Sequence, residues 1–390
     1  MAVCHSLQTP LLLLFCSSFQ LTSSQSEPCE PPWIRSFQLD NCSMLPPDEE
    51  KQITSNTMTV LLPILYLVAL VVGLPSNLVA LWVLLFRTKK QPSTILLINL
   101  TTCDLLLLLV LPFRITYHFQ GNDWTLGEPL CRLVMALFYG NMYGSMLCLA
   151  LIAFDRYLAL VHPISGMMLR SYRLSVYMSM AVWAVVLAAM MPLLATRQTY
   201  LIKNLNITTC HDALPLDTQR SFFLPYFASL FSICFMLPLV VVVFCYSCVL
   251  YTLVKAGKRY NHAVRVTVLV MVVCLVCLLP SNVLLISHNS NLLKEGEESS
   301  DNLYMPYMLM LALSTFNSCL DPFIFYYVSE DFREKAQHVL CCRKPTKVAT
   351  SSQKDTSSTS MSSRSKVTLL STSGQVSTTP GVSYLKADVV

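Results

Sequence analysis

The chain has 390 residues, of which 54% are hydrophobic and only 13% are charged, and its formal net charge is +5. Soluble chains carry about 25% charged residues, so the composition excludes a soluble globular protein and indicates that most of the chain lies in lipid. The small net charge does not indicate a nucleic-acid-binding protein, and we expect no nucleic-acid partner.

The chain begins with two segments that precede its long apolar stretches. Residues 1–25 contain an apolar core, Leu11–Phe15, followed by small polar residues, which predicts a removable signal peptide. Residues 26–57 are polar and contain five prolines, so we expect an exposed and disordered extracellular arm. This arm contains the run RSFQLDN, which starts at Arg35, and the acidic run Asp48–Glu50.

Seven apolar segments follow, each longer than the ~20 residues that a membrane-spanning helix needs. They lie at about 58–86, 93–119, 128–161, 173–196, 221–255, 259–289 and 302–328. The predicted fold is therefore an all-α membrane protein with a seven-transmembrane helix bundle over residues 58–328. Residues 329–342 predict a short amphipathic helix on the inner membrane surface, and residues 343–390 a disordered tail rich in Ser and Thr.

Loop charges predict the orientation of the spans. Lysines and arginines lie in the loops after spans one, three and five, whereas the opposite loops are acidic, which places the N-terminus outside the cell. We therefore expect a multi-pass plasma-membrane protein. Two outside sequons make Asn41 and Asn206 glycosylation candidates. Cys341 and Cys342, beside the amphipathic helix, are palmitoylation candidates or ordinary reduced cysteines.

Four cysteines lie outside the apolar runs or at their ends, where an oxidising compartment permits disulfides. Cys131 opens span three, and Cys210 lies in the long outer loop between spans four and five. A bridge between these two would pin that loop over the mouth of the bundle. Cys29 and Cys42 flank Arg35, and the sequence leaves open whether they pair with each other.

Two carboxylates lie inside predicted spans, where charges are costly and usually functional. Asp104 is in span two and Asp321 in span seven, and Asn141, Ser145 and Asn317 could face them. This group could bind a sodium ion or form a hydrogen-bond network that only holds the helices together. It also raises the weaker alternatives of an intramembrane aspartyl protease and an ion-coupled transporter, but the chain carries neither a GxGD signature nor an internal repeat. We expect no other cofactor.

The spans carry a set of residues that together resemble the rhodopsin-like G-protein-coupled receptors. The set consists of Asn77, Asp104, Cys131, Asp155-Arg156-Tyr157, Trp183, Pro238, Tyr246, Pro280 and Asp321-Pro322. In the outer loop, CHDAL at Cys210–Leu214 resembles a hallmark of the protease-activated receptors, and the longer run CHDALPLD is most similar to their fourth subtype. The resemblance implies a receptor without catalytic activity, with heterotrimeric G proteins, arrestins, receptor kinases and membrane lipid as partners.

The resemblance also implies a switch at the inner ends of the helices. Asp155, Arg156 and Tyr157 would form it together with Tyr246 and Phe325. Arg156 is expected to pair with Asp155 at rest and to meet the G protein when released. Phe325 stands where the family has a tyrosine, so the hydroxyl that would join Tyr246 is missing.

For the arm, the resemblance implies cleavage after Arg35 by a trypsin-like serine protease such as thrombin, which would link the receptor to blood coagulation. The new N-terminus would be a tethered agonist, SFQLDN, made of Ser36, Phe37, Gln38, Leu39, Asp40 and Asn41. The expected docking residues on the outer loop are His211, Asp212 and Asp217, with Asp212 pairing with the new ammonium group.

The arm is long enough for this mechanism, because the chain from Ser36 to Val60 spans up to ~80 Å when extended. The acidic run Asp48–Glu50 could attract the protease. The resemblance suggests coupling to the Gq and G12/13 classes, with phospholipase C and calcium downstream. A receptor for a soluble peptide, with an incidental Arg35, is the alternative, and an ion-coupled transporter is a more remote one.

Overall fold

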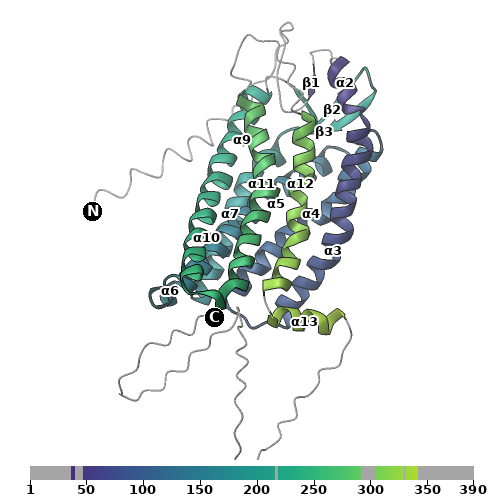
Figure 1. Cartoon of the computed structure of the whole chain (residues 1–390). Coiled ribbons are helices and arrows are strands. Elements are labelled where there is room, and N and C mark those ends of the chain that lie inside the picture. Colours follow the sequence, from purple (N-terminus) through teal and green to yellow (C-terminus); the bar gives the residue numbers. More distant parts are fainter. Residues whose placement is uncertain (1–36, 40–46, 216–217, 291–303, 329, 341–390) are drawn as a thin grey trace, which may run out of the picture.

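The computed structural model describes residues 37–39, 47–215, 218–290, 304–328 and 330–340. Within these ranges seven helices are long and apolar enough to cross a membrane, and Figure 1 shows them side by side in one bundle. The predicted fold class is therefore confirmed. The third of these helices is the most enclosed in the described chain, since 72% of its apolar window is buried, against 33% for the first.

The spans begin and end within a few residues of their predicted positions. They are α3 (Leu62–Phe86), α4 (Pro92–Phe119), α5 (Glu128–Leu160), α7 (Tyr172–Ala195), α10 (Leu237–Lys255), α11 (Asn261–Ser290) and α12 (Tyr304–Val328). The fifth span starts earlier than α10, because η2 (Gln219–Phe223), α9 (Leu224–Leu230) and the π-helical η3 (Phe231–Met236) run into it. The short α6 (Pro163–Leu169) and η4 (Lys258–Tyr260) lie in loops. Long apolar runs make spans predictable, because every backbone group in lipid must be satisfied within a helix.

One end of the bundle carries short strands, and we call it the outer end after the predicted orientation. β2 (Thr199–Ile202) and β3 (Ile207–Cys210) form an antiparallel hairpin in which Thr199 pairs with Cys210 and Ile202 with Ile207. Asn206, the glycosylation candidate, is exposed at the hairpin turn with a φ of 52°. β4 (Ala213–Pro215) follows directly after the hairpin.

The expectation of a disordered arm is wrong for two of its segments. Phe37–Leu39 forms strand β1 and Pro47–Ile53 forms helix α2, while the π-helical η1 (Thr57–Leu61) begins at the last residue of the arm and leads into α3. Figure 1 shows α2 beside the β2–β3 hairpin at the outer end of the bundle. The physical reason is apolar burial, because the Ile53 side chain is fully buried and belongs to the core of the bundle.

The predicted helix after the seventh span is also present. α13 (Glu330–Leu340) buries Phe332 and Ala336 against the bundle. The Phe332 ring meets Phe325 edge-on with the ring centroids 6.2 Å apart, and Gln337 Nε2 donates a hydrogen bond of 2.8 Å to the Tyr326 hydroxyl.

Several predicted residues lie outside the described part of the chain. They are the signal peptide, Cys29, Arg35, Ser36, Asp40, Asn41, Cys42, Asp217, Cys341, Cys342 and the tail from residue 343. The predictions made for them remain predictions.

Candidate functional site

A disulfide bond joins Cys131 in the first turn of α5 to Cys210 at the end of β3. The two Cα atoms are 5.8 Å apart, 79 residues separate them in sequence, and both side chains are fully buried. The predicted bridge is therefore confirmed. It anchors the long outer loop to the most enclosed helix of the bundle.

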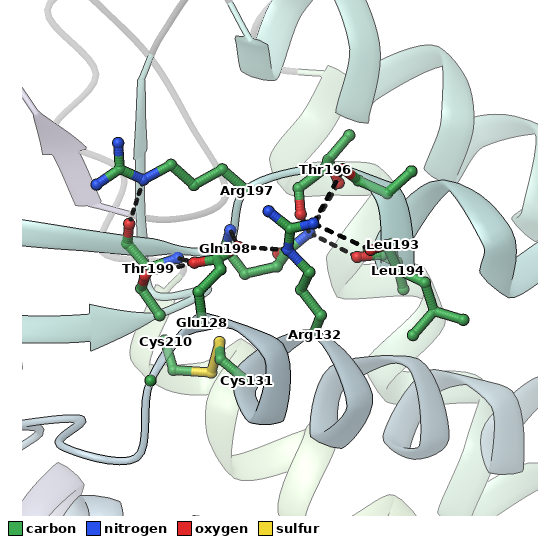
Figure 2. Close-up of polar contacts among 12 residues, drawn as sticks. Glu128, Cys131, Arg132, Leu193, Leu194, Thr196, Arg197, Gln198, Thr199 and Cys210 are labelled. Atoms are coloured by element: carbon green, nitrogen blue, oxygen red, sulfur yellow. Dashed lines mark hydrogen bonds and ion pairs between the residues drawn. A yellow bond between two sulfur atoms is a disulfide. The ribbon is translucent and has the colours of Figure 1, made fainter.

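A partly exposed network of polar contacts strengthens this anchor (Figure 2). Glu128, the first residue of α5, accepts hydrogen bonds from Arg132 Nε (2.6 Å) and from the backbone N–H of Gln198 (2.7 Å) through Oε1. Its Oε2 accepts from the backbone N–H of Thr199 (2.8 Å) and from the Thr199 hydroxyl. Bonds to a carboxylate are stronger than neutral ones, and a negative charge is favourable at a helix N-terminus. Glu128 therefore holds the first residues of β2 against α5.

Gln198, which Glu128 holds in place, in turn fixes the position of His211. The Gln198 carbonyl accepts the backbone N–H of His211 (2.8 Å), and Gln198 Oε1 lies 2.5 Å from His211 Nδ1. Because an amide oxygen only accepts, Nδ1 of His211 carries the proton. His211 has a φ of 70°, a left-handed conformation that is uncommon for residues other than glycine. Two contacts to one residue hold this conformation and so direct the next residue, Asp212.

Asp212 is a buried carboxylate with one oxygen available. Its Oδ1 accepts a hydrogen bond of 2.9 Å from the Tyr304 hydroxyl. Its Oδ2 is buried and has no hydrogen-bond partner among the described residues, although Asp212 is only 4% exposed. A buried carboxylate with a free acceptor is costly, and it is suited to receive a cationic group.

The counter-charge of Asp212 comes from inside the bundle. Arg114 in α4 is 1% exposed and interacts electrostatically with Asp212. Its guanidinium carbon lies 5.7 Å from the centre of the Tyr117 ring and 5.8 Å from that of Phe138, which are cation–π distances. The outer site is therefore an aromatic cluster that contains one buried positive and one buried negative charge.

The sequence predictions missed several residues of this outer site. Arg114 was detectable, because it is a charge inside a predicted span, the criterion that selected Asp104 and Asp321. The partnerships of Tyr304, Gln198 and Glu128 depend on how distant segments pack, and the sequence carries no pattern for them.

Strand β1 lies against the pinned loop. It pairs in parallel with β4, with Phe37 opposite Ala213, Gln38 opposite Leu214 and Leu39 opposite Pro215. Ala213 and Leu214 are 0% and 1% exposed. Pairing of an extended segment with an available strand is a common mode of peptide recognition, in which main-chain hydrogen bonds provide affinity.

Near the middle of the bundle, the structure brings the predicted sodium-site residues together. Asn141 Nδ2 and Ser145 Oγ donate to Asp104 Oδ1 over 3.3 and 3.4 Å, and Asn317 Nδ2 donates to Asp321 Oδ2 over 3.3 Å. All five residues are buried. Asp104 Oδ2 has no hydrogen-bond partner within the described ranges. Carboxylate, amide and hydroxyl oxygens are the ligands that a hard cation takes.

At the inner end of α5, the ion pair of Asp155 differs from the prediction. Asp155 Oδ1 accepts a bond of 2.9 Å from Arg170 Nε, and Oδ2 accepts one of 3.1 Å from Ser93 Oγ. The partner is therefore Arg170, and the expected pairing of Asp155 with Arg156 is wrong for this structure. The reason is that α6 returns the chain toward α5, so that Arg170 at its end reaches Asp155. Tyr157 contacts His162, with 2.9 Å between the hydroxyl and Nε2.

Arg156 instead lines a cavity of about 110 Å³ at the inner end of the bundle. Tyr246 from α10 and Phe325 from α12 line the same cavity, together with Val249, Leu253, Val266, Thr267, Val270 and Phe332. Three of the five predicted switch residues thus meet at one cavity. The cavity is therefore the candidate site of the predicted switch.

Comparison with known proteins gives a consistent result. The family described as 7 transmembrane receptor (rhodopsin family) matches residues 76–325. Proteinase-activated receptor 4 of Homo sapiens is 47% identical over 287 residues, which cover 74% of each chain. Proteinase-activated receptor 4 of Rattus norvegicus is 46% identical over 79% of this chain and 77% of its own length. Proteinase-activated receptor 2 of Rattus norvegicus is 40% identical over 75% and 74%. The similarity expected from CHDALPLD is confirmed.

The Glu128 network can be tested by replacing the carboxylate with an amide of the same shape. Glu128→Gln should destabilise the purified protein by on the order of 2 kcal/mol, because several charge-assisted bonds are weakened together. Its thermal melting temperature should fall by several degrees, whereas Lys203→Ala, at an exposed position of the same hairpin, should leave it unchanged. Equal melting temperatures for the two variants would contradict the role given to Glu128.

Proposed function

Because this chain belongs to the proteinase-activated receptors of the rhodopsin family, we propose that extracellular cleavage at Arg35–Ser36 unmasks a tethered agonist, SFQLDN. Membership in the family makes the protein a receptor rather than an enzyme, a multi-pass protein of the plasma membrane, coupled to G proteins and activated by a protease. The cleavage position, the agonist sequence and its docking are the finer steps of the proposal. Thrombin or another trypsin-like protease is the proposed activator.

The observation that carries this proposal is the pairing of β1 with β4. Phe37, Gln38 and Leu39 are the second to fourth residues of the proposed agonist, and their backbone pairs with the loop that the disulfide pins. In a parallel ladder both chains advance together. Extending the register by one residue would bring Ser36, where cleavage creates the new ammonium group, opposite Asp212.

The chemistry at that position supports docking of a cation. The free Oδ2 of Asp212 could accept hydrogen bonds from an ammonium group in a buried environment, where charge-assisted bonds are strong. Before cleavage the residue at position 36 has a neutral amide in place of the ammonium. Cleavage would therefore add a charge at the place where the site has an unused acceptor.

Transmission would follow α5. The disulfide joins the docking loop to the outer turn of α5, and the same helix carries Asp155, Arg156 and Tyr157 at its inner end. Docking would shift a pre-existing equilibrium between inactive and active bundles. In the active bundle, the cavity lined by Arg156, Tyr246 and Phe325 would open toward a G protein of the Gq or G12/13 class. Arrestins and receptor kinases would act on the Ser/Thr-rich tail, with membrane lipid around the bundle.

We also propose a sodium ion for the mid-bundle cluster. The residues fit such an ion, because Asp104 Oδ2 is a buried carboxylate oxygen without a hydrogen-bond partner in the described chain, and the Ser145 hydroxyl oxygen lies beside the same carboxylate. Asp104, Asn141, Ser145, Asn317 and Asp321 would hold the ion. Its charge would offset the two carboxylates and so stabilise the arrangement of α4, α5 and α12.

The remaining sequence predictions belong to the same proposal. They are an extracellular N-terminus after removal of a signal peptide, glycosylation at Asn41 and Asn206, and palmitoylation at Cys341 and Cys342. The exposure of Asn206 at the hairpin turn supports glycosylation at that residue.

The cleavage step is tested in cells that lack endogenous proteinase-activated receptors. Arg35→Ala should abolish the calcium response to thrombin and trypsin, while the response to the synthetic amide of SFQLDN stays at the wild-type level. Lys51→Ala, at another basic residue of the same arm, should retain both responses. A protease response retained by Arg35→Ala would contradict cleavage at this bond. A wild-type receptor that responds to the peptide but to neither protease would favour the soluble-peptide alternative.

The docking partner of the ammonium group is tested by a double-mutant cycle. Asp212→Asn should weaken the potency of SFQLDN roughly 10- to 100-fold, because one charged hydrogen bond contributes about 1.5–3 kcal/mol. N-acetylated SFQLDN, which lacks the charge, should be weak on both receptors and equally potent on each. If Asp212→Asn weakened the two peptides by the same factor, the pairing would be ruled out.

The sodium site is tested by protein stability. NaCl should raise the melting temperature of the purified wild-type receptor relative to choline chloride at equal ionic strength, because a ligand that binds only the folded state stabilises it. Asp104→Asn should remove this difference. Equal sodium dependence in the variant would show that the ion acts elsewhere.

A further inference from the structure

Helix α2 has a place in the fold that the tethered mechanism alone does not explain. The arm between the proposed agonist and the first span could be one long flexible chain, but Pro47–Ile53 is helical and packed against the outer loops. Ile53 is 0% exposed and joins the core of the bundle. Glu50 Oε2 accepts a hydrogen bond of 3.0 Å from Asn204 Nδ2 in the turn of the β2–β3 hairpin.

The main polar anchor of α2 is Asn122, in the loop between α4 and α5. Its Nδ2 donates a bond of 2.6 Å to the backbone carbonyl of Ile53, and its Oδ1 lies 2.6 Å from His118 Nδ1. Asn122 is 0% exposed, and its φ of 64° is left-handed. A buried amide with partners on both its oxygen and its nitrogen holds the end of α2 in one position.

The same loop also holds the hairpin that leads to the docking strand. Asp123 Oδ1 accepts the backbone N–H of Thr208 (2.8 Å), and the backbone N–H of Trp124 donates to the Thr208 carbonyl (2.6 Å). Thr208 lies in β3, two residues before Cys210. Three consecutive residues, 122–124, therefore fix both the end of the tether and the strand that precedes its landing site.

We propose that α2 is a clamp that shortens the tether, with Asn122 and Ile53 as its positioning residues; this inference rests on the proposed tethered mechanism. With α2 docked, the chain has eight residue steps from Leu39 to Pro47, which reach at most about 29 Å. With α2 released, the first anchored element is η1, whose first residue, Thr57, follows Leu39 by eighteen steps. Effective concentration falls roughly as the −3/2 power of tether length, so release of α2 lowers it about threefold.

The test measures how strongly the tether competes with a soluble probe. In uncleaved receptors, labelled SFQLDN amide competes only with the intact segment, which pairs with β4 but lacks the new ammonium group. After complete cleavage by trypsin the tether competes, so the apparent Kd of the probe rises by a factor set by the effective concentration of the tether. The readout for each receptor is the apparent Kd after cleavage divided by the Kd before cleavage. A general loss of folding would not lower this ratio.

The variants are Asn122→Gly, which tolerates the left-handed backbone, and Asn122→Gly combined with Ile53→Ala. The double variant should give a ratio about threefold lower than wild type, and the single variant a ratio between the two. Ten Gly/Ser residues inserted after Pro46 should lower the ratio by a similar factor without touching α2. Lys203→Ala, at an exposed position of the β2–β3 hairpin, should match wild type.

The outcomes separate this inference from the proposed function. Ratios that stay at the wild-type value in the Asn122 variants would overturn the clamp, provided that cleavage raises the apparent Kd of the wild type. If cleavage leaves the wild-type Kd unchanged, the tethered mechanism itself fails, and the clamp fails with it.

Discussion

One covalent constraint, the bond between Cys131 and Cys210, organises the outer half of this receptor. It holds the end of β3 at the first turn of α5, and the Glu128 carboxylate adds four hydrogen bonds beside it. Without such an anchor, the loop that carries His211 and Asp212 would pay a large entropic cost to present a buried carboxylate. With it, the loop becomes a rigid surface. Strand β4 and Asp212 are thereby held next to the helix that carries Asp155, Arg156 and Tyr157 at its other end.

The buried charges of this receptor are compensated by other charges or by hydrogen bonds. Asp104, Arg114, Asp212 and Asp321 are all buried, and a buried charge persists only when other charges or hydrogen bonds compensate for it. Arg114 and Asp212 compensate each other at the outer end, while amides and hydroxyls surround the two aspartates deeper in the bundle. Among their carboxylate oxygens, Oδ2 of Asp212 and Oδ2 of Asp104 have no hydrogen-bond partner in the described chain. They mark the places where we propose an ammonium group and a sodium ion.

The parts of the structure that were predictable are those with a local physical signal. Long apolar runs located the seven helices to within a few residues, and a cysteine at the end of span three with another in the loop between spans four and five indicated the disulfide. Contacts between distant segments were not predictable in this way. The pairing of Asp155 with Arg170 depends on how α6 turns back, and the docking of α2 depends on Asn122, a loop residue with no motif around it. The polar composition of residues 26–57 suggested disorder. Composition is an average over the segment and does not reveal that one apolar side chain, Ile53, is buried in the core.

The central claim is that the segment after Arg35 docks as a parallel strand on β4, and cysteine cross-linking in the cleaved receptor tests it most directly. A disulfide requires Cα atoms about 4.4–6.8 Å apart, a separation that directly paired strand residues satisfy. With Gln38→Cys, a second cysteine at Leu214 should form the bond, and cysteines at Ala213 or Pro215 should form it much less, because they are out of register. Peptide mapping by mass spectrometry identifies the product. Equal cross-linking at the three positions, or a preference for Ala213 or Pro215, would contradict the docking described here.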